Sequence, residues 1–166
     1  MNPRLADALL LAALLALAVW VALSGQGLPD RVATGFSLQG AAQDWMSRAE
    51  YLVVALGLQL LLPIGLLALP WFIARAPDRQ ISLPHRDHWL APERRQATLR
   101  WIGSHLRWFT LLVALWLAGL HALVRGAQAL NPPVLHPGLA MALLGSFLVG
   151  TAAWLLALWW HFHQRA

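Results

Sequence analysis

Apolar residues fill four long segments of the chain, and the polar residues are gathered between them. The four segments are residues 5–23, 51–74, 108–124 and 138–162, and charged side chains are nearly absent from each. An α-helix rises about 1.5 Å per residue, so about 20 residues cross a hydrocarbon core of roughly 30 Å. The pattern therefore predicts an all-α integral membrane protein, built as one four-helix bundle over residues 1–166.

The segments between the spans divide between the two sides of a membrane. Residues 24–50 and 125–137 would lie on one side, and residues 75–107 would lie on the other with both termini. Pro92 suits the first turn of a helix, and the carboxylate of Glu93 favours the positive end of a helix. We therefore expect a helical stem that continues into the third span.

The arginines indicate which side is the cytoplasm. Nine lie on the side of the termini (Arg4, Arg75, Arg79, Arg86, Arg94, Arg95, Arg100, Arg107 and Arg165), and three lie on the other (Arg31, Arg48 and Arg125). Cytoplasmic loops of membrane proteins carry an excess of Lys and Arg. We therefore predict cytoplasmic N- and C-termini, a cytoplasmic stem and an extracytoplasmic 24–50 loop. In the alternative, residues 8–23 are a secretory signal cleaved near Ser24, which would leave three spans.

The composition narrows the class of protein further. The net charge of +5 is explained by loop arginines that set orientation, so we predict no nucleic-acid partner. All the cations are Arg, and Ala and Leu abound, which indicates GC-rich bacterial coding. The expected location is thus the bacterial cytoplasmic (inner) membrane, with anionic lipids in contact with the stem.

The outer loop has the pattern of a small structured element. Its β-branched and apolar residues alternate at Val32, Thr34, Phe36 and Leu38, which predicts a short strand with one buried face. Gly40 can supply the positive φ of the following turn. Asp44 is the expected cap of the next helix.

Small residues recur at every fourth position in two of the spans. The first span carries Ala8, Ala12 and Ala16, and the last carries Gly138, Ala142, Ser146 and Gly150. Such stripes let helix backbones approach closely. We interpret them as packing faces within the bundle, with a dimerisation face as the alternative.

Two stretches of the sequence resemble a bacterial family. The first comprises Pro29-Asp30-Arg31-Val32, Phe36, Gly40 and the segment from Asp44-Trp45 to Ser47-Arg48. It resembles the signature loop of SdpI-like membrane proteins, named for an immunity protein against a secreted killing factor. The second, residues 81–95, is similar to a Leu-Pro…Asp…Trp-Leu-Ala-Pro-Glu-Arg-Arg string in small members of the same group. The resemblance implies a non-enzymatic membrane protein of immunity or signalling type, which recognises a peptide or protein.

The candidate partner-binding residues lie in these two stretches. Those of the outer loop are Pro29, Phe36, Gly40 and Trp45, and those of the inner segment are Arg86, Asp87, Trp89, Glu93 and Arg94. A second hypothesis is a structural or assembly subunit bound laterally to a larger membrane complex.

The histidines suggest a third hypothesis, a b-type haem electron carrier. His105 and His161 fall at the inner ends of the third and fourth spans, and His121 and His136 fall toward the outer side. Two facing imidazoles in one leaflet are the ligands of a b-type haem. The chain has no cysteine and no acidic partner beside its histidine pairs, so we predict no metal site. No nucleophile–base pair or carboxylate dyad stands out, so we predict no catalytic residues and no cofactor.

Overall fold

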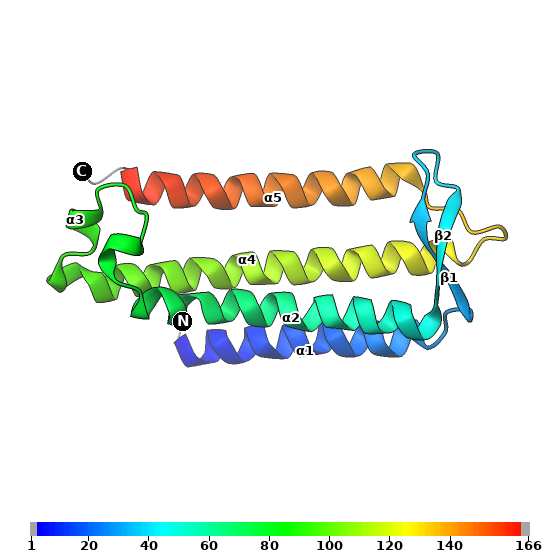
Figure 1. Cartoon of the computed structure of the whole chain (residues 1–166), viewed down its shortest axis with the longest axis horizontal. Helices are drawn as coiled ribbons and strands as arrows, with labels where there is room; N and C mark the ends of the chain where they lie inside the picture. The colour runs from blue at the N-terminus through cyan, green and yellow to red at the C-terminus, as the bar shows by residue number, and fades with distance from the viewer. Residues whose placement is uncertain (1–2, 164–166) are drawn as a thin grey trace.

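Four long helices lie side by side along the long axis of the molecule (Figure 1). The structure is a computed structural model that describes residues 3–163, with side chains from Leu5 onward. The helices are α1 (Pro3–Gly25), α2 (Arg48–Arg75), α4 (Pro92–Ala127) and α5 (Pro137–His163). Each is long and apolar enough to cross a membrane, and each contains one of the predicted spans. Two of the arginines counted above, Arg165 and the side chain of Arg4, lie outside the described part.

The two ends of the bundle carry different elements. At the hairpin end, β1 (Arg31–Phe36) and β2 (Ala42–Ser47) form a two-stranded antiparallel sheet (Figure 1). At the opposite end, which we call the stem end, lie a 3₁₀ turn η1 (Asp78–Gln80) and the short helix α3 (Arg86–Trp89). The predicted strand in the 24–50 loop is therefore confirmed, and the sequence pattern missed its partner β2.

The predicted alternation of buried and exposed residues in β1 was wrong. Val32 and Ala33 are neighbours, yet both are completely buried, whereas Thr34 and Phe36 are half-buried. The register with β2 is irregular on both sides of Gly35, so β1 does not keep a regular two-residue period. Side chains on both faces of the strand start are covered because β1 crosses the ends of the helices.

Gly40 makes the turn between the strands, as predicted. Its φ is 89°, a conformation that side chains disfavour, and its N–H donates to the carbonyl of Ser37. Its own carbonyl accepts a 2.9 Å hydrogen bond from the N–H of Leu135, in the loop before α5. An isolated β-bridge between Ala41 and Val134 adds a second link. The hairpin tip is thus joined to the 125–137 loop.

Ser47, rather than Asp44, caps α2. The Ser47 hydroxyl accepts from the N–H of Glu50, and the Glu50 carboxylate accepts from the N–H of Ser47 at 2.9 Å. This reciprocal pair is a capping box, which satisfies two otherwise unpaired backbone donors. The prediction for Asp44 was wrong because the chain stays extended for three more residues, so Asp44 belongs to β2.

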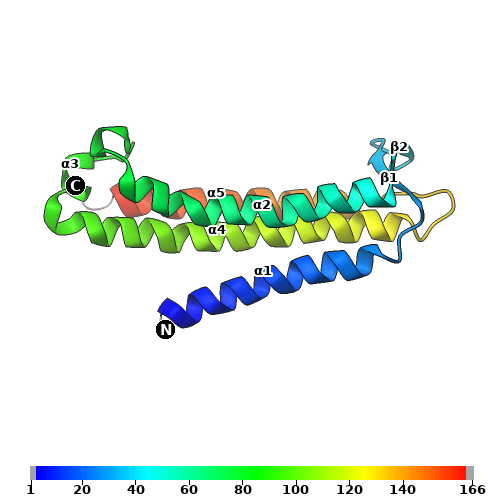
Figure 2. The ribbon, with the colours of Figure 1, turned by 60° about the horizontal axis from the view of Figure 1, so that its bottom comes forward.

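The predicted stem is confirmed as part of one continuous helix. α4 begins at Pro92 and runs for 36 residues, through the stem and the third span without a break. α4 is central, since α1, α2 and α5 all pack against it. α5 approaches no other long helix, and α1 leans away from the bundle toward the stem end (Figure 2).

The interpretation of the small-residue stripes as packing faces was wrong for α1. Ala8, Ala12 and Ala16 are all exposed, and α1 packs instead through Ala18, Val21 and Gly25 near the hairpin end. In α5 the stripe is exposed at three of its four positions, and of its two glycines Gly150 is the one that closely approaches another helix, at Leu112 of α4. Helix length and composition can be read from the sequence, but the face of a helix that is buried depends on which other helices pack against it.

Gly40→Ala should loosen the hairpin. A Cβ at this position would collide with the carbonyl oxygen of Leu135, and the positive φ adds strain of about 1–3 kcal/mol. We expect limited proteolysis within residues 31–47 to become at least about tenfold faster, because the open state becomes more populated. Gly57→Ala is the control, since its Cβ would meet no atom within 4 Å. Equal cleavage rates in the two variants would contradict the role of Gly40.

Candidate functional site

The side chain of Gln128 closes one edge of the hairpin. Its Oε1 accepts from the N–H of Ala33 and its Nε2 donates to the Ala33 carbonyl, both at 3.1 Å. The amide thus takes the place of a third strand beside β1. An unpaired strand edge is prone to pair with other chains, and natural proteins often cover such edges. Here Gln128, just beyond α4, protects β1.

The opposite edge, along β2, is open at Trp45. Ala33 and Trp45 are directly paired residues, and the Ala33 backbone points away from β2 toward Gln128. Ala33 and Trp45 are therefore a non-hydrogen-bonded pair. In such a pair of an antiparallel ladder, the backbone N–H and C=O groups of both residues point away from the partner strand, so those of Trp45 face outward. Within the described part of the chain, no backbone group pairs with them. The Trp45 side chain is 41% exposed.

Arg48 fastens the start of the hairpin to its end. Its guanidinium pairs with Asp30 at 3.1 Å and donates to the carbonyls of Leu28 at 3.0 Å and Gln26 at 3.3 Å. The Arg48 N–H also donates to the Asp30 carbonyl. Asp30 and Arg48 both lie in the outer-loop stretch that the sequence analysis singled out, and their contacts give them a structural role. Beneath them, Leu28, Val32 and Tyr51 form a small buried core.

Of the predicted partner-binding residues of the outer loop, two are buried or half-buried and two are exposed. Gly40 is buried in the turn, and Phe36 is half-buried at the end of β1. Pro29 and Trp45 are exposed, so their side chains are open to a partner. Leu38, at the hairpin tip, is 91% exposed and was not among the predicted residues.

A chain of hydrogen bonds joins three helices just below the hairpin. The Ser24 hydroxyl donates to the Trp20 carbonyl at 2.6 Å, so its oxygen is left to accept from Nε2 of His121 at 2.9 Å. In a neutral imidazole with its proton on Nε2, Nδ1 then accepts from the Tyr51 hydroxyl, also at 2.9 Å. Every proton in the chain has an acceptor, and α1, α2 and α4 are held together.

The edge of an indole and the face of a phenol complete the surroundings of His121. Trp20 meets the imidazole edge-on at 5.3 Å between ring centroids, and Tyr51 stacks on it at 5.7 Å. His121 is 3% exposed. Because both ring nitrogens are engaged and the ring is enclosed, this histidine acts as a structural link.

A cavity of about 160 Å³ lies beside this chain, between α2 and α4. Its polar lining consists of Tyr51, His121 and Gln59, and the rest is apolar. Gln59 is 2% exposed and its Nε2 donates to the Ala114 carbonyl at 3.2 Å, whereas its Oε1 has no partner among the described residues. A buried acceptor without a donor is unfavourable, and the Nε1 of Trp116 and the hydroxyl of Thr151 are likewise buried without a hydrogen-bond partner among the described residues.

At the stem end, Trp89 is buried rather than available to a partner. Its Nε1–H donates to the Phe162 carbonyl at 3.3 Å, and its ring packs on His161 and Phe162. Its own carbonyl accepts from the hydroxyl of Thr98 in α4. The prediction that Trp89 binds a partner therefore has to be corrected: the tryptophan attaches α3 to α4 and α5.

The other predicted residues of the inner segment are exposed. Arg86 and Asp87 pair with each other at 3.5 Å, and Asp87 is almost fully open to solvent. Arg94 contacts the ring of His88, and Glu93 lies in the first turn of α4. None of the cavities found at this end of the described chain is lined by Arg86, Asp87, Glu93 or Arg94.

The contacts of the four histidines give the haem hypothesis no support. His121 is occupied as described, and His105 lies between hydrogen-bond and stacking partners: its Nε2 is 3.0 Å from the Trp154 carbonyl, and its ring stacks on Trp101. His161 stacks on the same Trp101 at 3.8 Å between centroids, and His136 is exposed before α5. Within residues 3–163, no three His, Asp or Glu side chains converge as a metal site.

Sequence reasoning missed the residues that build the hairpin end. Gln128 and Ala33 are 95 positions apart, and Ser24 and His121 are 97 apart. Neither pair forms a motif, because a single polar residue near the end of an apolar segment carries no periodic signal. Asp7, which pairs with Arg107 at 3.0 Å, was also missed among the apolar residues of the first span.

Comparison of the chain with models of protein families, with curated proteins and with solved structures found no match.

Ser24→Ala and Tyr51→Phe should each destabilise the bundle. Either change leaves one nitrogen of His121 without its partner, and we expect a loss of about 1 kcal/mol in the free energy of unfolding in mixed micelles. Ser146→Ala is the matched control, because the Ser146 hydroxyl bonds only the Leu143 carbonyl of its own helix and is exposed. A Ser24→Ala variant as stable as Ser146→Ala would contradict the link between the helices.

Proposed function

We propose that this protein spans the bacterial cytoplasmic membrane and recognises an extended peptide or protein segment on its outer side by strand addition to β2. The observation that carries the proposal is the asymmetry of the hairpin: Gln128 occupies the edge of β1, whereas the edge of β2 at Trp45 is open. In this function the protein binds its partner and performs no catalysis.

The arginine distribution supports the orientation. Seven arginines of residues 75–107 lie toward the stem end, and three lie near the hairpin, so the positive-inside rule places the stem in the cytoplasm. The hairpin then faces the outside of the cell, where a secreted peptide would arrive. Both termini are cytoplasmic in this arrangement.

Strand addition matches the chemistry of the open edge. In this mode of binding, main-chain hydrogen bonds provide affinity, and side chains on alternate positions provide selectivity. Trp45 and Met46 are both partly exposed and project to opposite faces of the sheet. An added strand could therefore place an apolar side chain against the indole of Trp45 on one face and another against Met46 on the other.

The hairpin is held in place before a partner binds. The Arg48 contacts, the Gly40 link to Leu135 and the Gln128 amide hold the hairpin on three sides. A preorganised surface loses little conformational entropy on binding, so more of the interaction energy appears as affinity.

The resemblance to SdpI-like proteins suggests the biological role of this peptide recognition. The residues that resemble the signature loop, Pro29 to Arg48, are those of the hairpin and of the Asp30–Arg48 ion pair that joins its two ends. We accordingly propose membership of that group and an immunity or signalling role, in which the partner is a secreted peptide.

A lateral subunit of a larger membrane complex is the second candidate. The observation in its favour is that α5 packs against α4 and no other long helix, and large apolar side chains such as Leu148, Val149 and Trp160 remain exposed. In that case the partner would contact α5 and not the hairpin. The following experiment separates the two functions.

A photo-crosslinking amino acid at Gln43, on β2, should give an adduct with the peptide partner in native membranes. Trp45→Pro should abolish the adduct, because proline removes the outward N–H while the β1–β2 pairing keeps its own hydrogen bonds. Trp45→Phe retains the backbone donor and should retain the adduct. The same crosslinker at Val149, on α5, is the comparison position.

Adducts at Val149 that are unaffected by Trp45→Pro, with none at Gln43, would favour the lateral subunit instead. Adducts at Gln43 of equal intensity in the Pro and Phe variants would contradict strand addition.

A further inference from the structure

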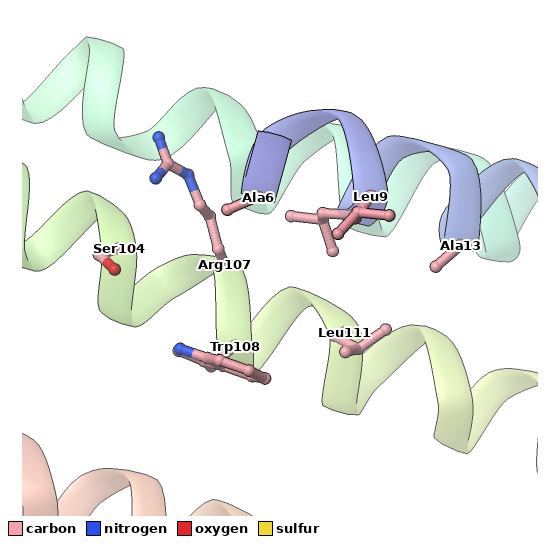
Figure 3. Close-up of a pocket in the computed structure, with 8 residues that line it drawn as sticks. Ala6, Leu9, Ala13, Ser104, Arg107, Trp108 and Leu111 are labelled. Atoms are coloured by element: carbon pink, nitrogen blue, oxygen red, sulfur yellow. The ribbon is translucent and has the colours of Figure 1, made fainter. Parts of the chain in front are cut away.

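Two neighbouring cavities at the stem end share part of their lining, and we call them together the groove. The first, of about 290 Å³, lies between α1 and α4 (Figure 3), and the second, of about 750 Å³, lies between α2 and α4. Ser104 and Arg107 line both cavities. The groove exists because α1 leans away from the bundle at this end (Figure 2).

Polar side chains line one wall of the groove at helical spacing. Arg100, Ser104 and Arg107 are separated by four and three positions, so they lie on one face of α4. The Nε of Arg107 pairs with Asp7, and within residues 3–163 its two terminal nitrogens make no hydrogen bond. Arg100 and the Ser104 hydroxyl likewise make no hydrogen bond or ion pair within the described residues and are exposed.

The remaining arginine of the groove is already satisfied. Arg95 pairs with Asp78 at 3.0 Å and donates to the carbonyls of Ala74 and Ala76. Three guanidinium groups therefore face two paired carboxylates, those of Asp7 and Asp78, which leaves one net positive charge. A single monoanion would neutralise the groove.

The apolar part of the groove extends from the arginines toward the middle of the bundle. Leu9 and Ala13 of α1 and Trp108 and Leu111 of α4 line it (Figure 3), together with Leu10. These residues follow Arg107 in the direction of the hairpin, so the cationic end lies nearest the stem and the apolar end lies deeper. In the proposed orientation, that is the direction in which an inner-leaflet lipid points.

We propose that this groove is a binding site for one anionic glycerophospholipid of the cytoplasmic leaflet. The phosphodiester lies against Arg100, Ser104 and the terminal nitrogens of Arg107, which supply charge-assisted hydrogen bonds. One acyl chain occupies the slot between α1 and α4. A zwitterionic lipid would leave the positive charge of the groove uncompensated, so the site selects an anionic headgroup.

This site rests on the proposed membrane insertion but not on peptide recognition, since the hairpin lies at the other end of the bundle. It also differs from diffuse attraction of the basic stem to an anionic surface. Diffuse attraction depends on total charge, whereas the groove depends on particular arginines. Two single substitutions of equal charge separate these cases.

The test uses the full chain in phosphatidylcholine nanodiscs that contain phosphatidylglycerol with brominated acyl chains. Bromine quenches indole fluorescence on contact, and the contribution of Trp108 is the difference between the native chain and Trp108→Phe. We expect brominated phosphatidylglycerol to quench this contribution at a mole fraction about tenfold lower than brominated phosphatidylcholine requires. A tenfold ratio is typical of one charge-assisted interaction.

Arg100→Gln should raise the required mole fraction of phosphatidylglycerol about tenfold. Arg94→Gln removes the same charge from the same helix outside the groove and should change it less than about twofold. Both positions are exposed, so neither change disturbs packing, and circular dichroism checks the helix content.

Equal shifts in the two variants would overturn the site in favour of diffuse surface attraction. Equal quenching by the two brominated lipids would overturn headgroup selection. If inorganic phosphate binds to the protein at Arg100 while Trp108 is never quenched, the ligand is a free anion and the lipid proposal is wrong.

Discussion

The interaction on which the arrangement of the helices depends is the hydrogen-bond chain from Tyr51 through His121 to Ser24. Three helices each contribute one group to it, and both bonds between the helices are 2.9 Å long. In lipid, burial of apolar surface between helices gains little, so packing and interhelical hydrogen bonds decide how helices associate. This chain fixes α1, α2 and α4 at one level, directly beneath the hairpin.

Because the three helices are hydrogen-bonded together near the hairpin, the two ends of the bundle differ. At the hairpin end, α1 is held by Ser24 and by the close packing of Gly25 against α2, and the strands of the hairpin lie against α2 and α4. Toward the stem end, the ion pair between Asp7 and Arg107 bridges α1 and α4 across the cleft, and the helices separate. One end is therefore a rigid support for a strand edge, and the other is an open groove.

The sequence predicted the parts of the fold that depend on local patterns. The four apolar segments, the stem that begins at Pro92 and the positive φ of Gly40 all follow from composition, helix-start chemistry or backbone sterics, and the structure confirms them. Cap assignment failed at Asp44 because two acceptable cap residues lie three positions apart, and only the length of β2 decides between them.

The candidate site was predicted less completely, because its determinants are long-range. Trp89 has the same surroundings in the sequence whether it is exposed or buried, and only the arrival of Phe162 from α5 covers it. Gln128 looks like any polar residue at a helix end until Ala33 is placed beside it. Within the segment from Pro29 to Arg48, Asp30 and Arg48 stabilise the hairpin, while Trp45 lies at its open edge, and the sequence pattern does not distinguish these two roles.

The placement of the hairpin and the stem on opposite sides of a bilayer is tested most directly by cysteine accessibility. The chain contains no cysteine, so Leu38→Cys and Asp87→Cys each introduce a single, highly exposed thiol. A membrane-impermeant thiol reagent applied to spheroplasts should label the cysteine at position 38, and it should label the one at position 87 only after lysis. Labelling of both positions before lysis, or of position 87 alone, would contradict a four-span topology with the hairpin outside.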